Sequence, residues 1–223
     1  MVAAAVRAVV FDLDGTLIDS RLDITAATNH MLRAGGRDEL AVAEVCRHVG
    51  NGARYLVAGV VGLEENDPAL DAWLSTFLDY YTAHATDHST LMPDALRVLD
   101  ELSFLPLALC TNKPRATTDA TLRGLSLGGH FSAVVAGDDL PVKKPDPGPL
   151  LHIARTLELP ANELVMVGDG PPDIQCGQAV GARTVGVEGG ILPRAELVRS
   201  EPDALIQLGE LPQLIARWRS ADG

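Results

Sequence analysis

The amino-acid sequence predicts an α/β protein, a doubly wound parallel sheet with a helical domain inserted after its first strand. Apolar runs rich in Val, Leu and Ala recur without strict alternation, as expected of strands buried on both faces of a parallel sheet. From Leu105 onward these runs alternate with segments of helical periodicity, which is the pattern of βαβ units. The predicted strands are Val6–Leu13, Leu105–Thr111, Ala133–Gly137, Leu164–Gly168 and Thr184–Val187.

The segments between and after these strands complete a Rossmann-like arrangement. Each connection is long enough for a helix that returns the chain to a parallel strand. The expected crossover helices are Arg115–Leu125, Pro149–Leu157 and Asp173–Val180. The tail is expected to form a helix from Arg194, a short strand at Ala204–Ile206 and a final helix through Leu211–Trp218.

A helical region interrupts the alternation between Leu13 and Leu105. No convincing strand is present there, and apolar residues recur at helical spacing in four segments separated by glycines and Pro68. We therefore expect a core domain of residues 1–20 and 91–223 and an inserted helical cap domain of residues 21–90. The four expected helices are Ile24–Leu32, Val42–Val49, Tyr55–Val61 and Leu70–Tyr81.

Composition excludes several classes of partner. The chain has 223 residues, 47% of them hydrophobic and 22% charged, which is typical of a soluble globular protein. Its net charge of −12 argues against nucleic-acid binding, which needs clustered Lys and Arg. The sequence contains no apolar run of about eighteen residues, so we expect neither a transmembrane helix nor a membrane partner. A small anionic substrate is compatible with this charge if a cation or lysine lies at the site.

The N-terminus and the cysteines indicate a cytoplasmic protein. Arg7 interrupts the apolar run MVAAAVRAVVF and Asp12 ends it, and no cleavage-site pattern follows, so we interpret this run as the first core strand rather than a signal peptide. Cys46, Cys110 and Cys176 lie far apart without a CxxC motif. This spacing suits free thiols in a reducing compartment.

Paired acids follow the first predicted strand in the stretch VVFDLDGTLIDS. Asp12 and Asp14 lie two residues apart, and like charges held close together raise at least one pKa. A strand end does not need this repulsion, so we expect the pair to be neutralised or used. Gly15 directly after the acids permits a tight turn.

Polar side chains follow the other predicted strands as well. Because ligands bind at the carboxyl ends of strands in an open parallel sheet, these side chains are expected to gather at one edge. The groups are Thr111-Asn112-Lys113, Lys143-Lys144-Pro145, and Gly168-Asp169 with Asp173 four residues on. With Asp12 and Asp14 these make four groups at equivalent positions, which predict a site for chemistry on a charged substrate.

In order and spacing, these motifs resemble those of the haloacid dehalogenase superfamily, specifically its phosphatases. The matching stretches are FDLDGTLIDS, TNK, KKP and VGD with a second Asp four residues later. The inserted stretch VGNGARYL is similar to the helical cap of phosphoglycolate phosphatases. The resemblance covers nearly the whole chain, from about Val6 to Val187.

The resemblance implies a role for each acid and for one lysine. Asp12 is expected to attack phosphorus and form an aspartyl-phosphate, and Asp14 to donate a proton to the leaving alkoxide and later accept one from water. Lys144 is expected to hold the phosphoryl oxygens and Asp12 together. Lys143 is the competing lysine, but the family's lysine directly precedes a proline, here Pro145. We therefore expect Lys143 to be a solvent-exposed surface residue.

The resemblance also implies a Mg²⁺ site and a phosphate-binding pair. Oxygen ligands suit this hard cation, and the expected ligands are Asp12, Asp14 through its backbone carbonyl, Asp169 and Asp173. Asp173 either holds a metal-bound water or orients Lys144; the alternative is an acid favoured by the helix dipole. The Thr111 hydroxyl and the Asn112 backbone amide are expected to bind phosphoryl oxygens.

Two regions leave the specificity open. The Gly50-Asn51-Gly52 stretch is either a turn between helices or part of the face that the cap presents to the substrate, with Asn51 and Arg54 as candidate contacts. Gly170-Pro171-Pro172 departs from the family, which commonly has Ser after VGD, so the position of Asp173 is less certain than that of Asp169. Met92-Pro93-Asp94 and Glu188-Gly189-Gly190 also depart from the usual pattern.

The function implied is a Mg²⁺-dependent phosphomonoesterase acting on 2-phosphoglycolate, as a monomer or homodimer. The alternatives are a phosphatase of another small ester such as a sugar phosphate, a sugar phosphomutase, and a non-catalytic phosphoryl-binding module. A dehalogenase is disfavoured because that chemistry needs neither the acid at Asp14 nor the metal site. Asp14, which is suited to activating water, also argues against a non-catalytic module.

Overall fold

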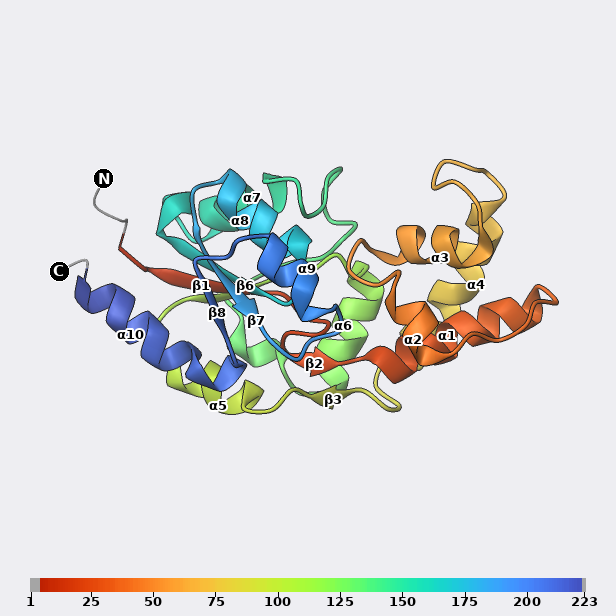
Figure 1. Ribbon diagram of the computed structural model, residues 1–223, viewed down its shortest axis with the longest axis horizontal. Helices are drawn as coiled ribbons and strands as arrows, with labels where there is room; N and C mark the ends of the chain where they lie inside the picture. The colour runs from red at the N-terminus through yellow and green to blue at the C-terminus, as the bar shows by residue number, and fades with distance from the viewer. Residues whose placement is uncertain (1–4, 222–223) are drawn as a thin grey trace.

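The chain folds into an α/β structure whose sheet is six-stranded and parallel, as the computed structural model shows for residues 5–221 (Figure 1). The strand order is β5-β4-β1-β6-β7-β8, and every neighbouring pair is parallel. The predicted fold class is therefore confirmed. Residues 1–4 and 222–223 of the expected core domain lie outside the described residues. The strands are β1 (Ala8–Phe11), β4 (Leu107–Cys110), β5 (Ala133–Val135), β6 (Leu164–Gly168), β7 (Arg183–Val187) and β8 (Ala204–Ile206).

Burial on both faces explains why the strands lack polar alternation. In β1, Val9 and Phe11 face one hydrophobic cluster, whereas Ala8 and Val10 face another on the opposite side of the sheet. All four residues are fully buried. Each face of the sheet therefore requires apolar side chains, and the sequence shows a continuous apolar run.

Helices cover both faces of the sheet. Helices α5 (Ala95–Glu101) and α10 (Leu211–Ala221) pack on the face of Phe11, with Leu99 and Ile215 in the shared cluster. Helices α7 (Gly148–Thr156) and α8 (Pro171–Ala179) pack on the face of Val10 (Figure 1). The remaining helices of this part are α6 (Arg115–Gly124) and α9 (Arg194–Arg199), with short 3₁₀ turns at Gly128–His130, Ala161–Glu163 and Leu208–Glu210.

Four helices form a separate helical segment beside the carboxyl ends of the strands (Figure 1). They are α1 (Arg21–Ala34), α2 (Val42–Cys46), α3 (Ala53–Val61) and α4 (Leu70–Ala83). Met31, Val57 and Phe77 belong to a hydrophobic cluster that this segment builds for itself. Helix α2 is shorter than predicted, because the chain tightens into i→i−3 turns as far as Val49 before Gly50 adopts a φ of 111°.

Two very short strands lie where the chain leaves and rejoins the sheet region. β2 (Ile18–Asp19) pairs antiparallel with β3 (Thr90–Leu91). The expectation that no strand lies between Leu13 and Leu105 was therefore wrong. Two residues are too few to leave a periodic pattern, and only the tertiary pairing defines these strands.

A buried carboxylate links the chain segment that enters the helical region to the segment that returns from it. Asp23, in the first turn of α1, accepts the backbone N–H groups of His88 at 2.9 Å and Ser89 at 2.8 Å. It also accepts the Ser89 hydroxyl at 2.6 Å, and only 2% of the residue is exposed. The helical segment is thereby fixed to the returning chain. Within the described residues, no helix has the length and apolar character needed to cross a membrane.

Candidate active site

The turn after β1 separates its two acids. The Asp12 N–H donates to the carbonyl of Val167 on β6 at 2.9 Å, so Asp12 still follows the sheet. Gly15 then adopts a φ of +88°, which an L side chain rarely tolerates, and its N–H donates to Ile18 at 2.8 Å. As a result the carboxylates diverge: Asp12 contacts Lys144, and Asp14 contacts a different lysine.

Lys144 is a buried cation enclosed by acceptors. Its Nζ donates to Asp12 Oδ1 at 2.7 Å, to Asp173 Oδ1 at 2.5 Å and to the Cys110 carbonyl at 2.5 Å. An ammonium has three N–H donors, so all three are used. Burial opposes the charge on Lys144, but the charges of Asp12 and Asp173 outweigh it and raise the pKa of the ammonium well above its ordinary value. Lys144 therefore stays charged.

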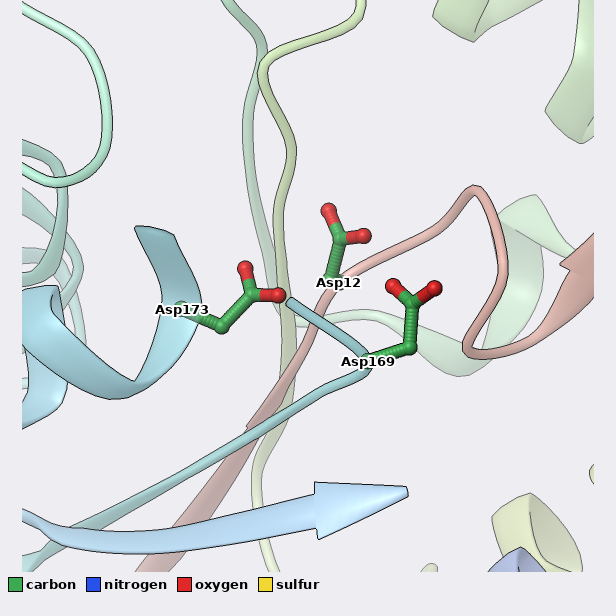
Figure 2. A group of neighbouring side chains, drawn as sticks. All are labelled: Asp12, Asp169 and Asp173. Atoms are coloured by element: carbon green, nitrogen blue, oxygen red, sulfur yellow. The ribbon is translucent and has the colours of Figure 1, made fainter. Parts of the chain in front are cut away.

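Three carboxylates lie close together beside this ammonium. Asp12 follows β1, Asp169 follows β6 and Asp173 lies in the first turn of α8, and one oxygen of each lies within 4.8 Å of the others (Figure 2). Burial, reinforced by repulsion from Asp173, raises the pKa of Asp12 to about 7 despite the opposing attraction of Lys144. Burial and then the charge of Asp12 raise the pKa of Asp169 well above its usual range. The cluster thus holds more negative charge than its own residues balance.

The donor set fits a hard divalent cation. Carboxylate oxygens are the ligands that Mg²⁺ prefers, and a cation there would offset the repulsion that raises the pKa values of Asp12 and Asp169. The Asp169 carboxylate is held in place by the Ile191 N–H at 2.7 Å and by the Thr16 hydroxyl at 3.5 Å. A Cβ on Gly15 would lie 2.2 Å from Asp169 Oδ2. The backbone at Gly15 therefore lies so close to the Asp169 carboxylate that no side chain fits between them.

Asp14 stands apart from the three-carboxylate cluster. Its Oδ1 accepts Lys113 Nζ at 2.9 Å and the Ser20 hydroxyl at 2.6 Å. Lys113 also donates to the Tyr81 hydroxyl, which comes from α4 in the helical segment. Sequence reasoning placed Lys113 at the sheet edge but assigned it no role. The available signal was its place directly after Thr111-Asn112 at the end of a strand.

The Asn112 side chain joins three segments. Its Nδ2 donates to the carbonyls of Lys144 and Gly50, both at 2.9 Å, and its Oδ1 accepts the Lys144 N–H at 3.0 Å. The Thr111 hydroxyl accepts the Lys113 N–H at 3.1 Å. Both residues lie at the site, and the Asn112 side chain links the loop that carries Lys144 to Gly50 of the helical segment. Phosphoryl binding by the Thr111 hydroxyl and the Asn112 amide stays a prediction.

The start of α8 explains how the Gly-Pro-Pro departure is accommodated. The helix begins at Pro171, where a fixed φ and a missing N–H are tolerated. Asp173 Oδ2 accepts the Gly170 N–H at 3.1 Å, while its Oδ1 faces Lys144. Asp173 therefore contacts Lys144 and also belongs to the carboxylate cluster. That it holds a metal-bound water stays a prediction.

A small pocket of about 60 Å³ connects these groups to the helical segment. The core contributes its charged residues, including Asp12, Lys113 and Lys144. The helical segment contributes an apolar wall with one hydroxyl, formed by Ile24, Val49, Gly50, Gly52, Ala53, Leu56, Phe77 and Tyr81. The pocket between the two parts therefore has its charged residues on the core side only.

The two candidate contacts on the helical segment lie elsewhere. Arg54 donates from Nη1 to Asp71 at 2.7 Å and from Nε to the Glu65 carbonyl at 2.5 Å, and it does not line the pocket. Asn51 lines a neighbouring open groove with Lys143 and Asp146. Lys143 is partly exposed, 3.9 Å from Glu65. The structure does not bring Asn51 or Arg54 to the carboxylates.

The fold and these motifs define a class of protein. The model of the haloacid dehalogenase-like hydrolase family matches residues 9–187. The chain is 36% identical over 207 residues to a phosphoglycolate phosphatase of Pectobacterium atrosepticum, covering 91% of this chain and 88% of that protein. It is 37% identical over 189 residues to one of Chromobacterium violaceum, covering 82% and 85%. The chain belongs to the haloacid dehalogenase-like hydrolases.

Solved structures agree with this assignment. A crystal structure of a predicted phosphoglycolate phosphatase from Haemophilus somnus superposes with a TM-score of 0.87 at 25% identity, covering 94% of this chain and 97% of that one. A predicted phosphatase from Clostridium acetobutylicum has the same fold, with a TM-score of 0.86 at 20% identity over 96% of this chain and all of that one. Within the family, the protein is a phosphatase of the phosphoglycolate phosphatase-like group.

Proposed function

We propose that the protein is a Mg²⁺-dependent phosphomonoesterase that hydrolyses 2-phosphoglycolate to glycolate and phosphate through an aspartyl-phosphate. The observation that carries this proposal is the divergence of Asp12 and Asp14. One carboxylate faces a buried lysine and two further acids, while the other faces the helical segment beside Lys113. The relatives named phosphoglycolate phosphatase support the choice of substrate.

In the proposed reaction, a carboxylate oxygen of Asp12 attacks phosphorus and the ester P–O bond breaks. Asp14 donates its proton to the leaving alkoxide. Water then attacks phosphorus, Asp14 accepts a proton from it, and the bond between phosphorus and Asp12 breaks. Lys144, 2.7 Å from Asp12, is placed to hold the phosphoryl oxygens as charge develops on them.

The proposed Mg²⁺ site consists of Asp12, Asp169 and Asp173, with the backbone carbonyl of Asp14 as a further ligand. The ion, when bound, would neutralise charge on the phosphoryl group. Asp12 and Asp169 would bind it as carboxylates, and Asp173 would also keep Lys144 in place. The burial of all three acids supports this arrangement, because an uncompensated buried cluster of like charges is costly.

We further propose that residues 21–90 act as a cap on a core of residues 1–20 and 91–223. The Asn112–Gly50 and Lys113–Tyr81 contacts join the two parts around the pocket. Such a cap would exclude water while the ester bond breaks and would contact the leaving group. The free thiols Cys46, Cys110 and Cys176 support a reducing, cytoplasmic setting, and we expect a monomer or homodimer.

The decisive experiment measures phosphate release from 2-phosphoglycolate with Mg²⁺. Asp12→Asn removes the nucleophile with little change in volume, and we expect release to fall to background. Asp100→Asn, at a carboxylate whose side chain is 73% exposed, is the matched control and should retain full activity. Release must also stop on chelation of Mg²⁺ and resume when the ion is restored. Undiminished turnover by Asp12→Asn would overturn the mechanism.

A panel of esters tests the substrate separately from the mechanism. Sugar phosphates, 2-phosphoglycolate and a generic aryl phosphate are compared under the same conditions. Preference for a sugar phosphate would replace the proposed substrate but leave the phosphatase chemistry intact. Transfer of the phosphoryl group to a second sugar hydroxyl would indicate a mutase, and a stable aspartyl-phosphate without turnover would indicate a binding module.

A further inference from the structure

Lys113 is a second buried cation, on the side of the pocket that faces the helical segment. Its side chain is 1% exposed. Lysines are rarely buried this deeply unless polar groups surround the ammonium. Its Nζ lies 2.9 Å from Asp14 Oδ1, donates to the Tyr81 hydroxyl, and stands 4.3 Å from the centre of the Tyr81 ring. The carboxylate and the tyrosine thus give the buried ammonium two polar partners.

The two pocket lysines differ in how many donors they have left. Lys144 has three acceptors for its three N–H groups. Lys113 has two acceptors, Asp14 and Tyr81, in the part of the chain that the structure describes. Among the described residues that line the pocket, these two are the only ones with a basic side chain. Lys113 is therefore the pocket cation that retains an N–H donor for a ligand.

Its position relative to the two acids fixes which part of a substrate it meets. In the proposed reaction, the phosphoryl group binds at Asp12 and the leaving oxygen lies at Asp14, which protonates it. Lys113 contacts Asp14 and the helical segment, so it lies beyond the leaving oxygen. The wall that surrounds this position is apolar, with Ile24, Leu56 and Phe77. In such surroundings a second anionic group on the leaving alcohol would need this cation.

We propose that Lys113, oriented by Tyr81, binds the carboxylate of the leaving group and so determines specificity for phosphate esters of small hydroxy acids. This inference rests on the proposed phosphatase function and assigns the substrate carboxylate to one residue. Tyr81 is a positioning residue: its hydroxyl and its ring hold the ammonium from the side of the helical segment. Arg54, which pairs with Asp71 away from the pocket, is not needed for this recognition.

The test compares two phosphate esters with the same two-carbon skeleton, 2-phosphoglycolate and 2-hydroxyethyl phosphate, in which an uncharged hydroxymethyl group replaces the carboxylate. The variant is Lys113→Gln, which keeps a polar side chain but removes the positive charge. We expect the preference for 2-phosphoglycolate, expressed as the ratio of the two kcat/KM values, to fall about 10- to 100-fold, the size expected for a charge-assisted hydrogen bond. The loss should appear mainly in KM for 2-phosphoglycolate.

Matched variants separate recognition from general damage. Lys143→Gln removes a charge from a partly exposed lysine one residue from Lys144, and its preference should equal that of the wild type. Tyr81→Phe keeps the ring and removes the hydroxyl, so its preference should fall by less than that of Lys113→Gln. If Lys113→Gln does not fold, Tyr81→Phe decides the question, because an unchanged preference in it would overturn the proposal.

Three further outcomes are informative. Equal losses on both substrates in Lys113→Gln would overturn the inference and leave Lys113 as a partner of Asp14 alone. A wild-type protein that hydrolyses both esters equally would overturn it while the phosphatase function stands. A wild-type protein that hydrolyses neither ester, with Mg²⁺ present, would overturn the proposed function itself.

Discussion

Lys144 Nζ lies 2.7 Å from Asp12 Oδ1, although the two residues are 132 positions apart in the chain. The contact joins the end of β1 to the loop before α7, and Asp173 holds the same ammonium from the other side at 2.5 Å. Lys144 therefore favours the ionised form of Asp12, which burial and Asp173 oppose. The pKa of Asp12 should therefore change when either Lys144 or Asp173 is replaced.

Replacing Lys144 with Met should abolish most activity without emptying the space that the side chain fills. The variant removes the cation that we propose holds the phosphoryl oxygens, so we expect kcat to fall by about 10²- to 10³-fold. The loss should be similar for 2-phosphoglycolate and 2-hydroxyethyl phosphate, because Lys144 lies at Asp12 rather than at the leaving group. Steady-state kinetics on both esters provide the measurement. Lys143→Met is the control, and a comparable loss in it would contradict this assignment.

Binding of Mg²⁺ should strengthen as the pH rises through neutrality. Without metal, the folded-state pKa of Asp12 is about 7, above its ordinary value of 3.8. Between these values the folded state holds a proton that the unfolded state releases, so the metal-free protein loses stability as the pH rises. Mg²⁺ would bind the ionised carboxylate at the proposed site, so its stabilising effect should be larger at pH 8 than at pH 6.

Thermal melting with and without Mg²⁺ across this pH range measures the effect. Asp12→Asn should lose most of the pH dependence, because the amide does not titrate in this range. Asp100→Asn should retain it. An increase in Tm on adding Mg²⁺ that is the same at pH 6 and pH 8 would contradict the linkage.

Gly15→Ala should displace Asp169. A Cβ at this position would lie 2.2 Å from Asp169 Oδ2, and the residue has a φ of +88°. We expect loss of both phosphatase activity and stabilisation by Mg²⁺, with a decrease of about 1–3 kcal/mol in the free energy of unfolding.

Gly189→Ala separates the two causes. Gly189 has a similar φ of +86°, but no atom lies within 4 Å of a Cβ placed there. This variant experiences the backbone strain without the clash, so it should lose some stability and keep its activity. Calorimetry and phosphate release compare the two variants. Equal activity in both would show that the Gly15 contact with Asp169 does not matter.

Asn112→Asp should loosen the attachment of the helical segment. The substitution replaces the Nδ2 group, which donates to the Lys144 and Gly50 carbonyls, with a carboxylate oxygen. Both hydrogen bonds are lost, and the new oxygen repels the two carbonyl oxygens. We expect a destabilisation of about 1–3 kcal/mol and faster amide hydrogen exchange in α3. Hydrogen exchange followed by mass spectrometry is the measurement. Unchanged exchange in α3 would indicate that the Gly50 contact does not hold the segment.

Much of the fold and part of the site follow from local sequence. Strands buried on both faces and crossover helices leave long apolar signals, and all five predicted main strands and the short strand Ala204–Ile206 are present. Asp12, Asp169, Asp173 and Lys144 converge because each follows a parallel strand or begins the next helix at the same sheet edge. Strands β2 and β3, each two residues long, left no such signal.

The sequence by itself therefore determined the class of fold, the acids and the lysine at the sheet edge, because these depend on patterns within short segments. Only the tertiary structure decided which side chains of the helical segment reach the pocket. Arg54 turns to Asp71, whereas Tyr81 meets Lys113. These pairings depend on how two separately packed parts meet, and that geometry has no local signature. The acids of VVFDLDGTLIDS thus acquired their partners, Lys144 for Asp12 and Lys113 for Asp14, through folding.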